Sequence, residues 1–375
     1  DDWVVIHDGE TEFVGYDYTS IPTKILRYRK VKQKKGEYYQ IVLDKTPFYA
    51  EMGGQVGDCG TLTDGEGNVL EIYDTKRENG MAVHLAHKLP VNPNAEFIAA
   101  IDEKARMATS CNHTATHLLH KALRDVLGTH VEQKGSFVSP DVLRFDFSHF
   151  QKVTPEELRK VEHLANAMVR EAIERDERRC VPIAEAREMG AMALFGEKYG
   201  EEVRVIRYGD SVELCGGTHV SNTGNIGMIR IISESSTAAG IRRIEAITGE
   251  AVENALDTMS DTIHEIGAMF NNTPDLMSAL RRSINENADL RKQVDEFMQE
   301  RINTIASKLL DSAEECNGRK IVSISGVRVP DMVKGVAFAV RAASPTNTVF
   351  VAATSDVSGK PLLTVMVTDD LTKEG

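Results

Sequence analysis

The chain has 375 residues, of which 41% are hydrophobic and 27% are charged, and its net charge is −13. This length exceeds one ordinary core, so we expect two or three domains, and no apolar run is long enough to cross a membrane. Five scattered cysteines exclude a disulfide framework and favour a reducing cytoplasm, while the negative charge restricts any nucleic-acid contact to a local basic patch.

The first 95 residues predict a small β-barrel or sandwich. Short runs rich in β-branched and aromatic residues alternate with Gly, Asp and Asn turns at residues 3–6, 23–28, 38–43 and 68–73. Residues 24–35 hold seven Lys and Arg side chains, ending at Lys35, and no acidic one. This run is either an RNA contact or the solvated side of a hairpin.

A glycine-rich loop lies inside this region, at residues 46–60. It contains Gly53, Gly54 and Gln55. Several glycines in one loop indicate special backbone angles or the close approach of another segment or ligand. The glycines alone predict only a loop.

Two short motifs in the next region point to a metal site. His113 and His117 lie four apart in a predicted helix and therefore share one face. Cys215 and His219 flank two glycines in a predicted tight turn. Three imidazoles and one thiolate form a tetrahedral set that suits zinc, whereas a lone His pair is also common on helix surfaces. His120, one turn further, is a substitute ligand, a group behind the ligands or an ordinary packing residue.

Residues 96–249 predict one α+β domain around these motifs. The helix that carries the histidines leads to a strand at 142–147, and further strands are expected at 203–206, 226–232 and 239–246. Thr154 predicts the N-cap of a second helix, with Pro155 at its first position and Glu157 completing a capping box. We expect that helix to run to about Arg178.

The remainder predicts a helical linker at 250–317 and a partial α/β terminal module at 318–375. Thr273 is the expected N-cap of the second linker helix, with Pro274 at its first position. The terminal module is expected to have strands at 320–325, 348–353 and 362–367 and a helix at 330–343. The fold class is therefore α+β, in four consecutive regions bounded at 95, 249 and 317.

Four motifs in this order resemble the alanyl-tRNA synthetase family, in the part that follows its aminoacylation and tRNA-recognition domains. They are residues 46–58, the pair His113 and His117, residues 133–136 (Gln-Lys-Gly-Ser) and residues 215–219. The resemblance covers essentially the whole chain, which begins without a methionine, so we expect a fragment of the longer enzyme that lacks the ATP-binding aminoacylation core.

The resemblance implies an editing domain that hydrolyses tRNA(Ala) mischarged with serine or glycine. It further implies a zinc ion bound by His113, His117, Cys215 and His219, and partners that comprise this tRNA, the enzyme's own N-terminal aminoacylation domain and a second copy in a homodimer formed through the terminal domain.

The same resemblance assigns roles to other residues. Gln133 is expected to recognise the serine hydroxyl, and Cys215 and Arg242 are expected to act in catalysis, with Arg242 holding the terminal adenosine or phosphate. Arg243 shares that role or forms a structural salt bridge. The expected contacts to substrate or tRNA also include Lys134 and the loop residues Gly53, Gly54 and Gln55.

Three other hypotheses for the function compete with the editing domain of an alanyl-tRNA synthetase. The chain is alternatively a free-standing trans-editing hydrolase, the editing domain of a threonyl-tRNA synthetase, or a non-catalytic RNA-binding module stabilised by zinc. The role of the zinc is also open. Four protein ligands leave no open position, so the ion either positions the substrate or, after one ligand is replaced, acts on the ester directly.

Overall fold

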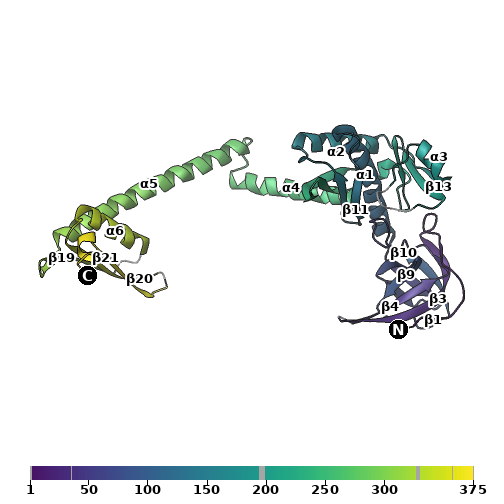
Figure 1. Cartoon of the computed structure of the whole chain (residues 1–375), viewed down its shortest axis with the longest axis horizontal. Helices are drawn as coiled ribbons and strands as arrows, with labels where there is room; N and C mark the ends of the chain where they lie inside the picture. Colours follow the sequence, from purple (N-terminus) through teal and green to yellow (C-terminus); the bar gives the residue numbers. More distant parts are fainter. Residues whose placement is uncertain (1, 35, 194–198, 327–329, 357, 375) are drawn as a thin grey trace. The chain divides into compact units, whose positions relative to one another are not determined.

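The computed structural model describes residues 2–34, 36–193, 199–326, 330–356 and 358–374. It separates into two compact units, residues 1–260 and residues 261–375. Helices and strands occur throughout both units (Figure 1), which confirms the α+β class. Among the described helices, none has the length and apolar character needed to cross a membrane.

Ten strands and their turns form the start of the first unit. Their bounds are β1 Val4–Val5, β2 Glu12–Phe13, β3 Ser20–Gln33, β4 Gly36–Leu43, β5 Lys45–Thr46, β6 Gly60–Asp64, β7 Val69–Ile72, β8 Asp74–Glu78, β9 Met81–Ala86 and β10 Glu96–Ile101. Eight of them form one sheet in the order β7-β6-β10-β3-β4-β9-β8, with β1 paired to β3. Strand β10 belongs to this sheet, although it lies beyond the expected boundary at residue 95.

The closed barrel expected for this region is not formed. Among the described strands, no pairing joins the two ends of the sheet, β7 and β8. The long strand β3 pairs with β10 along residues 20–24 and with β4 along residues 25–33, so the sheet divides into two parts around it. The sequence pattern predicts strands but not the pairing of the outermost ones, which is why it did not reveal the open edges.

Three of the seven basic side chains in residues 24–35 pair with acidic side chains. Lys24 pairs with Glu96, Arg29 with Glu78, and Lys30 with Glu37. These partly exposed pairs favour a solvated hairpin, and an RNA contact here stays a prediction. Lys35 lies outside the described residues.

His84 is fully buried in this sheet, and its pKa differs between the folded and the unfolded chain. Its Nε2 lies 2.7 Å from the Thr46 hydroxyl and its Nδ1 lies 2.8 Å from the Ile41 carbonyl oxygen. Burial lowers the pKa of His84 from 6.5 to about 4. The unfolded chain therefore binds a proton between these two values that the folded chain does not bind, and stability falls as the pH falls from about 6.5 to about 4.

We expect this histidine to make the first unit sensitive to acid. Between pH 7 and pH 5 it should remove about 2 kcal/mol from the free energy of unfolding. Trp3 is the only tryptophan and packs against this sheet, so urea unfolding followed by its fluorescence reports on this part of the chain. His84→Gln should lose about 2 kcal/mol less over the same pH interval. Equal losses in the two proteins would contradict the assignment.

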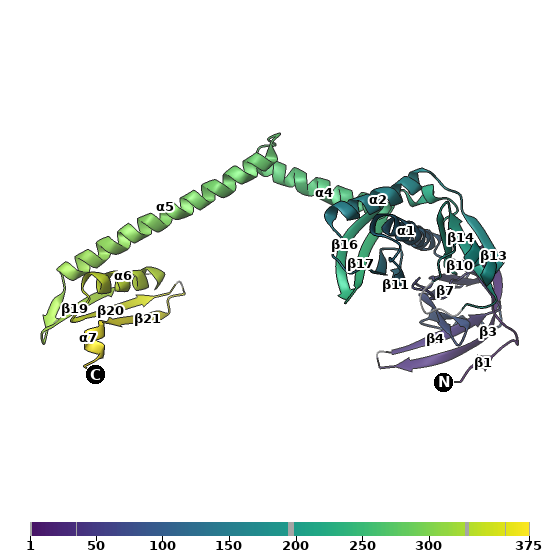
Figure 2. The same ribbon diagram turned by 45° about the horizontal axis from the view of Figure 1, so that its top comes forward.

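The second part of this unit is built around one long helix, α1 (Glu103–Leu127), which Asp102 caps by accepting a hydrogen bond from the Ala105 amide. One side of α1 packs on a four-stranded sheet of order β11-β12-β17-β16. The bounds are β11 Gln133–Val138, β12 Leu143–Ser148, β16 Ile229–Ala238 and β17 Ile241–Thr248. The helix α2 (Pro155–Arg170) packs beside α1 and against β16 (Figure 2).

The predicted start of α2 is confirmed and its predicted end is wrong. Thr154 forms the capping box with Glu157, and Pro155 is the first helical residue. The helix ends at Arg170, not near Arg178, because Ala172 adopts a φ of +52° and the chain turns into a new strand. Thr223 fixes this turn by accepting a hydrogen bond from the Ile173 amide, a contact 50 residues away that local pattern does not reveal.

A three-stranded sheet, β13-β14-β15, completes the unit. Its bounds are β13 Asp176–Pro182, β14 Glu202–Tyr208 and β15 Ser211–Leu214, accompanied by the short helices α3 Ile183–Glu188 and η1 Thr223–Ile226. The strand β15 is buried along its whole length, and it leads directly into the turn that carries Cys215.

The remaining elements are the linker helices and the terminal module. They are α4 Glu250–Met269, α5 Leu276–Asp311, β18 Glu314–Cys316, β19 Arg319–Ser325, α6 Pro330–Ala343, β20 Thr348–Ser355, β21 Pro361–Val367 and α7 Asp369–Thr372. The three predicted strands and the predicted helix are present, and β18 is an additional edge strand. The cap of α5 is Asp275, not Thr273, because its carboxylate accepts from the Ser278 amide.

Candidate metal centre and its cavity

The buried face of α1 carries the first two expected ligands. His113 and His117 are 7% and 3% exposed, in a stretch of α1 that is buried from Thr109 to His120. The helix is enclosed because sheet β11-β12-β17-β16 covers one side and strand β15 lies on another. Polar side chains in so enclosed a position require partners, and the structure supplies them.

The turn at residues 215–219 brings the other two expected ligands to this helix. Arg204 shapes the turn by donating to the carbonyl oxygens of Cys215, at 2.8 Å, and Gly217, at 2.6 Å. The Tyr16 hydroxyl donates to the Gly216 carbonyl oxygen, and the Arg204 guanidinium stacks 3.9 Å above the Tyr16 ring. A turn held at three consecutive carbonyl groups presents its side chains in one fixed arrangement.

The four predicted ligands converge. One donor atom from each of His113, His117, Cys215 and His219 lies within 4.8 Å of the other three. The Cys215 sulfur is 3.4 Å from Nε2 of His113 and 3.2 Å from Nε2 of His219. Burial lowers the pKa of His113 to about 3 and also lowers the pKa values of His117 and His219, so all three rings are neutral, the form that binds metal.

The surroundings of the rings fit a zinc ion. Nδ1 of His113 donates to the Gln55 amide oxygen at 2.8 Å, and Nδ1 of His219 lies 2.9 Å from the Thr114 hydroxyl. In each ring the other nitrogen is then left for a metal, the usual arrangement of metal-binding histidines. Within the described part of the chain, the buried Nδ1 of His117 has no hydrogen-bond partner, which a bound cation would supply.

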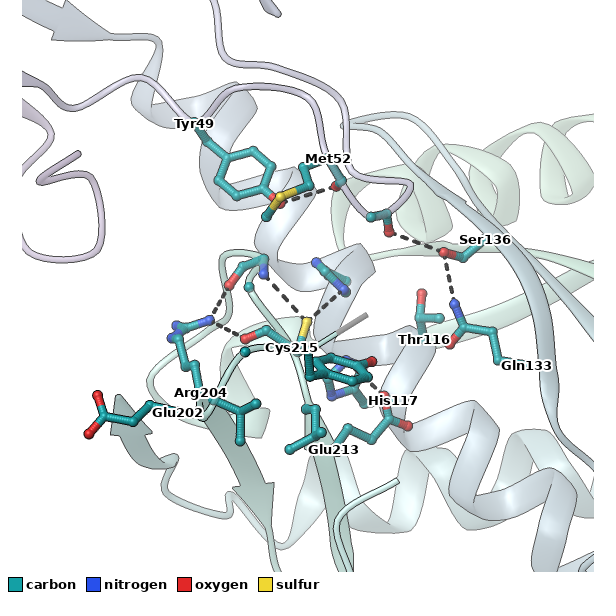
Figure 3. A pocket seen from close by; sticks show the side chains of 18 residues that line it. Tyr49, Met52, Thr116, His117, Gln133, Ser136, Glu202, Arg204, Glu213 and Cys215 are labelled. Carbon is teal, nitrogen blue, oxygen red and sulfur yellow. Dashed lines mark hydrogen bonds and ion pairs between the residues drawn. The ribbon is translucent and has the colours of Figure 1, made fainter. Parts of the chain in front are cut away.

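A cavity of about 270 Å³ opens beside this cluster (Figure 3). His113, His117 and Cys215 form one side of it, and Gln133 and Ser136 of β11 form another. The Gln133 amide Nε2 donates to the Ser136 hydroxyl at 3.1 Å, which holds the Gln133 side chain at the cavity. The full lining comprises Tyr49, Met52, Gly53, His113, Thr116, His117, Gln133, Ser136, Tyr199, Gly200, Glu202, Val203, Arg204, Glu213, Leu214, Cys215, Gly216 and Gly217.

The glycine-rich loop joins the first sheet to this site. Gly53 lines the cavity, and Gly54 accepts a hydrogen bond from the Val138 amide at 2.8 Å. A Cβ at Gly54 would lie 2.4 Å from the Ser136 carbonyl oxygen, and its φ of +85° also favours glycine. Gln55 is fully buried and bonds His113 and Thr218, so it supports the cluster.

Three residues with expected substrate roles lie away from the cavity wall. On β17, Arg242 pairs with Glu234 at 2.5 Å and Arg243 pairs with Asp146 at 2.6 Å. Lys134 pairs with Glu132 at 3.0 Å. None of these three cations is among the described residues that line the cavity.

Four residues of the site were not predicted from the sequence. Glu213 contacts His117, Thr114 contacts His219, and Arg204 and Tyr16 hold the turn. Only Glu213 could have been recognised from the sequence. It lies two residues before the candidate ligand Cys215, and a carboxylate in that position can reach a metal-binding histidine. His120 lies behind the candidate ligands, which is one of the three predictions for this residue, because its Nδ1 donates a hydrogen bond to Glu213.

Family models match two parts of the chain, one of which contains the motif at residues 215–219. Residues 203–245 match the family described as "Threonyl and Alanyl tRNA synthetase second additional domain". Residues 3–105 match the family "tRNA synthetases class II (A)", a match that the motifs alone did not predict.

Several full-length relatives are similar over the chain. The alanine-tRNA ligase of Bacteroides fragilis is 57% identical over 374 residues, which is all of this chain and 43% of the relative. Those of Porphyromonas gingivalis and Cytophaga hutchinsonii are 52% and 46% identical over the same length, covering 43% and 42% of each relative. The chain thus spans less than half the length of the ligases that it matches.

Proposed function

Because this chain belongs to the alanyl-tRNA synthetase family, a family of class II enzymes, we propose that it hydrolyses the ester bond of tRNA(Ala) mischarged with serine or glycine. The observation that carries the proposal is the cavity that has metal-binding donors on one side and Gln133 on another. Such a cavity would place a group that activates an ester beside a group that distinguishes the side chain of the esterified amino acid.

The need for a second, hydrolytic site follows from the chemistry of the amino acids. A synthetic pocket for alanine cannot strongly reject serine, which adds one hydroxyl, or glycine, which is smaller. A separate site discriminates by giving the serine hydroxyl a partner that alanine leaves unpaired. We assign that partner to the amide oxygen of Gln133, whose Nε2 is already engaged by Ser136.

The chemistry rests on the four donors and on the turn that holds two of them. When bound by His113, His117, Cys215 and His219, a zinc ion supplies positive charge that polarises an ester carbonyl or orients the aminoacyl group. Arg204 keeps Cys215 in place through two carbonyl groups of the turn. The three neutral imidazoles are ready to bind without first losing a proton.

The proposal extends to contacts outside the cavity. Gly53 lines the cavity. Together with Gly54 it belongs to the loop over which the aminoacylated end of the tRNA would pass. Arg242, Arg243 and Lys134 are exposed or partly exposed cations near the same sheet, so we assign them to the RNA rather than to the ester. The partners would be tRNA(Ala), the aminoacylation domain of the same enzyme and a second copy, in the cytoplasm.

The deciding experiment compares two esters on one tRNA. The protein is incubated with seryl-tRNA(Ala) and with alanyl-tRNA(Ala), with and without a zinc chelator. Faster loss of the seryl ester, abolished by the chelator, is the expected result. If the folded, zinc-loaded chain hydrolyses neither ester but binds the tRNA, it is an RNA-binding module stabilised by zinc.

Replacing Gln133 should weaken discrimination without unfolding the domain. In Gln133→His we expect the preference for seryl over alanyl ester to fall about tenfold, the value of one hydrogen bond to the substrate hydroxyl. The ratio of the two kcat/KM values measures this. The matched control is Gln299→His, at an exposed position of α5. An unchanged ratio in Gln133→His would show that a residue other than Gln133 recognises the serine hydroxyl.

A further inference from the structure

Glu213 is a carboxylate buried between two histidines of α1. Its Oε2 lies 3.0 Å from Nε2 of His117, and its Oε1 accepts from Nδ1 of His120 at 2.8 Å. The three side chains are 4% to 6% exposed. Both carboxylate oxygens are therefore engaged, and by two rings that lie three residues apart on the same helix.

The backbone fixes where this carboxylate lies. Glu213 is on β15, where it is paired with Ile206 of β14, and it precedes Cys215 by two residues. The strand that positions Cys215 thus also positions Glu213, and α1 positions both histidines. The carboxylate meets the rings through rigid elements rather than through a loop.

The three ligand rings are not held in the same way. His113 and His219 each use Nδ1 for a protein partner, and each has Nε2 within 3.4 Å of the Cys215 sulfur. His117 is reversed, because Glu213 occupies its Nε2. Its Nδ1 is buried and, among the described residues, has no hydrogen-bond partner.

We propose that Glu213 is a positioning residue: it holds the Nε2 proton of His117 and so turns Nδ1 of this ring toward the metal, whereas His113 and His219 bind through Nε2. His120 holds the other carboxylate oxygen and prevents Glu213 from rotating away from His117. This inference rests on the proposed metal site, but it does not depend on the hydrolytic activity.

The wild-type protein provides the first test. In the zinc-loaded chain labelled with ¹⁵N-histidine, two-bond proton–nitrogen spectra show which ring nitrogen carries a proton and which binds the metal. We expect one ligand ring with a protonated Nε2 and a metal-bound Nδ1, and two ligand rings with the reverse pattern. Three rings that all bind through Nε2 would overturn the proposal. This test needs no variant and no substrate.

The second test measures metal affinity in Glu213→Gln. Glu213 holds the two rings with two different oxygens, of which the amide keeps one, so His117 or His120 loses its hydrogen-bond acceptor. Zinc affinity should therefore fall roughly 10- to 100-fold. Competition with a chromophoric chelator gives the affinity. The absorption spectrum of the cobalt-substituted protein should change, because it reports ligand geometry directly.

The matched control is Glu162→Gln, a second buried carboxylate in the same unit. Glu162 accepts from the Ile231 amide and from Arg230, away from the metal ligands. This variant should lose stability and retain wild-type zinc affinity and the wild-type cobalt spectrum. A folded Glu213→Gln protein with wild-type values for both would refute the positioning role. Absence of hydrolysis in the wild-type protein, together with the expected fall in zinc affinity in Glu213→Gln, would count against the proposed function and leave the positioning role standing.

Discussion

Replacing Cys215 with alanine is expected to lower zinc affinity and ester hydrolysis together, each by roughly a hundredfold or more. The Cys215 sulfur is the only anionic donor of the four and lies within 3.4 Å of Nε2 of both His113 and His219. Without it, the three remaining donors are neutral rings, and a bound dication loses its one directly coordinated negative charge. Zinc content after dialysis and deacylation of seryl-tRNA(Ala) measure the two losses.

The control for this substitution is Cys180→Ala. Cys180 is exposed on β13 and takes no part in the cluster, so the variant should keep wild-type zinc content and hydrolysis. Full zinc content and full activity in Cys215→Ala would show that Cys215 neither binds the metal nor takes part in hydrolysis. Full zinc content with lost activity would separate metal binding from the action of the thiolate on the ester.

The convergence of His113, His117, Cys215 and His219 could be predicted because each of the two motifs has a local geometry. Four residues of spacing place His113 and His117 on one face of a helix, whatever surrounds that helix. Two glycines between Cys215 and His219 indicate a turn. The chemistry of imidazole and thiolate then joins the two motifs without any knowledge of the fold.

The partners of the ligands could not be predicted, because they are set by tertiary packing. Thr114 and Gln55 are ordinary polar residues, and only the burial of α1 brings them to His219 and His113. Glu213 lies two residues before Cys215, but its place beside His117 depends on β15 being buried on both faces, which the sequence does not show. Sequence patterns place such a side chain in solvent, where most carboxylates lie.

The same limit explains the errors in the fold. The end of α2 is set by Thr223, which is distant in sequence, and the open sheet of the first region is set by which edges find partners. By contrast, the capping box of Thr154 is complete within four residues and was predicted correctly. The expected roles of Arg242 and Arg243 came from the resemblance alone, and their ion pairs place them at the sheet rather than at the cavity wall.

Close packing at one glycine connects the glycine-rich loop to the metal ligands. A Cβ at Gly217 would lie 2.0 Å from Cε1 and 2.3 Å from Nδ1 of His113, and 2.7 Å from the Gln55 amide oxygen. Both neighbours are buried and bonded to each other, so neither moves without breaking that hydrogen bond. The turn, the loop and the first ligand therefore meet at this one position.

Gly217→Ala should consequently displace His113 and weaken zinc binding and hydrolysis by at least about tenfold, with a stability loss of about 1–3 kcal/mol from overpacking. The adjacent variant Gly216→Ala is the matched control, because its Cβ would meet the end of the flexible Met52 side chain at 3.0 Å and the Tyr16 hydroxyl at an ordinary contact distance of 3.9 Å. Zinc affinity and the cobalt spectrum should change in the first variant and stay near wild type in the second. Equal behaviour of the two variants would show that His113 does not depend on this contact, and that the ring is held in place by Gln55 and the helix alone.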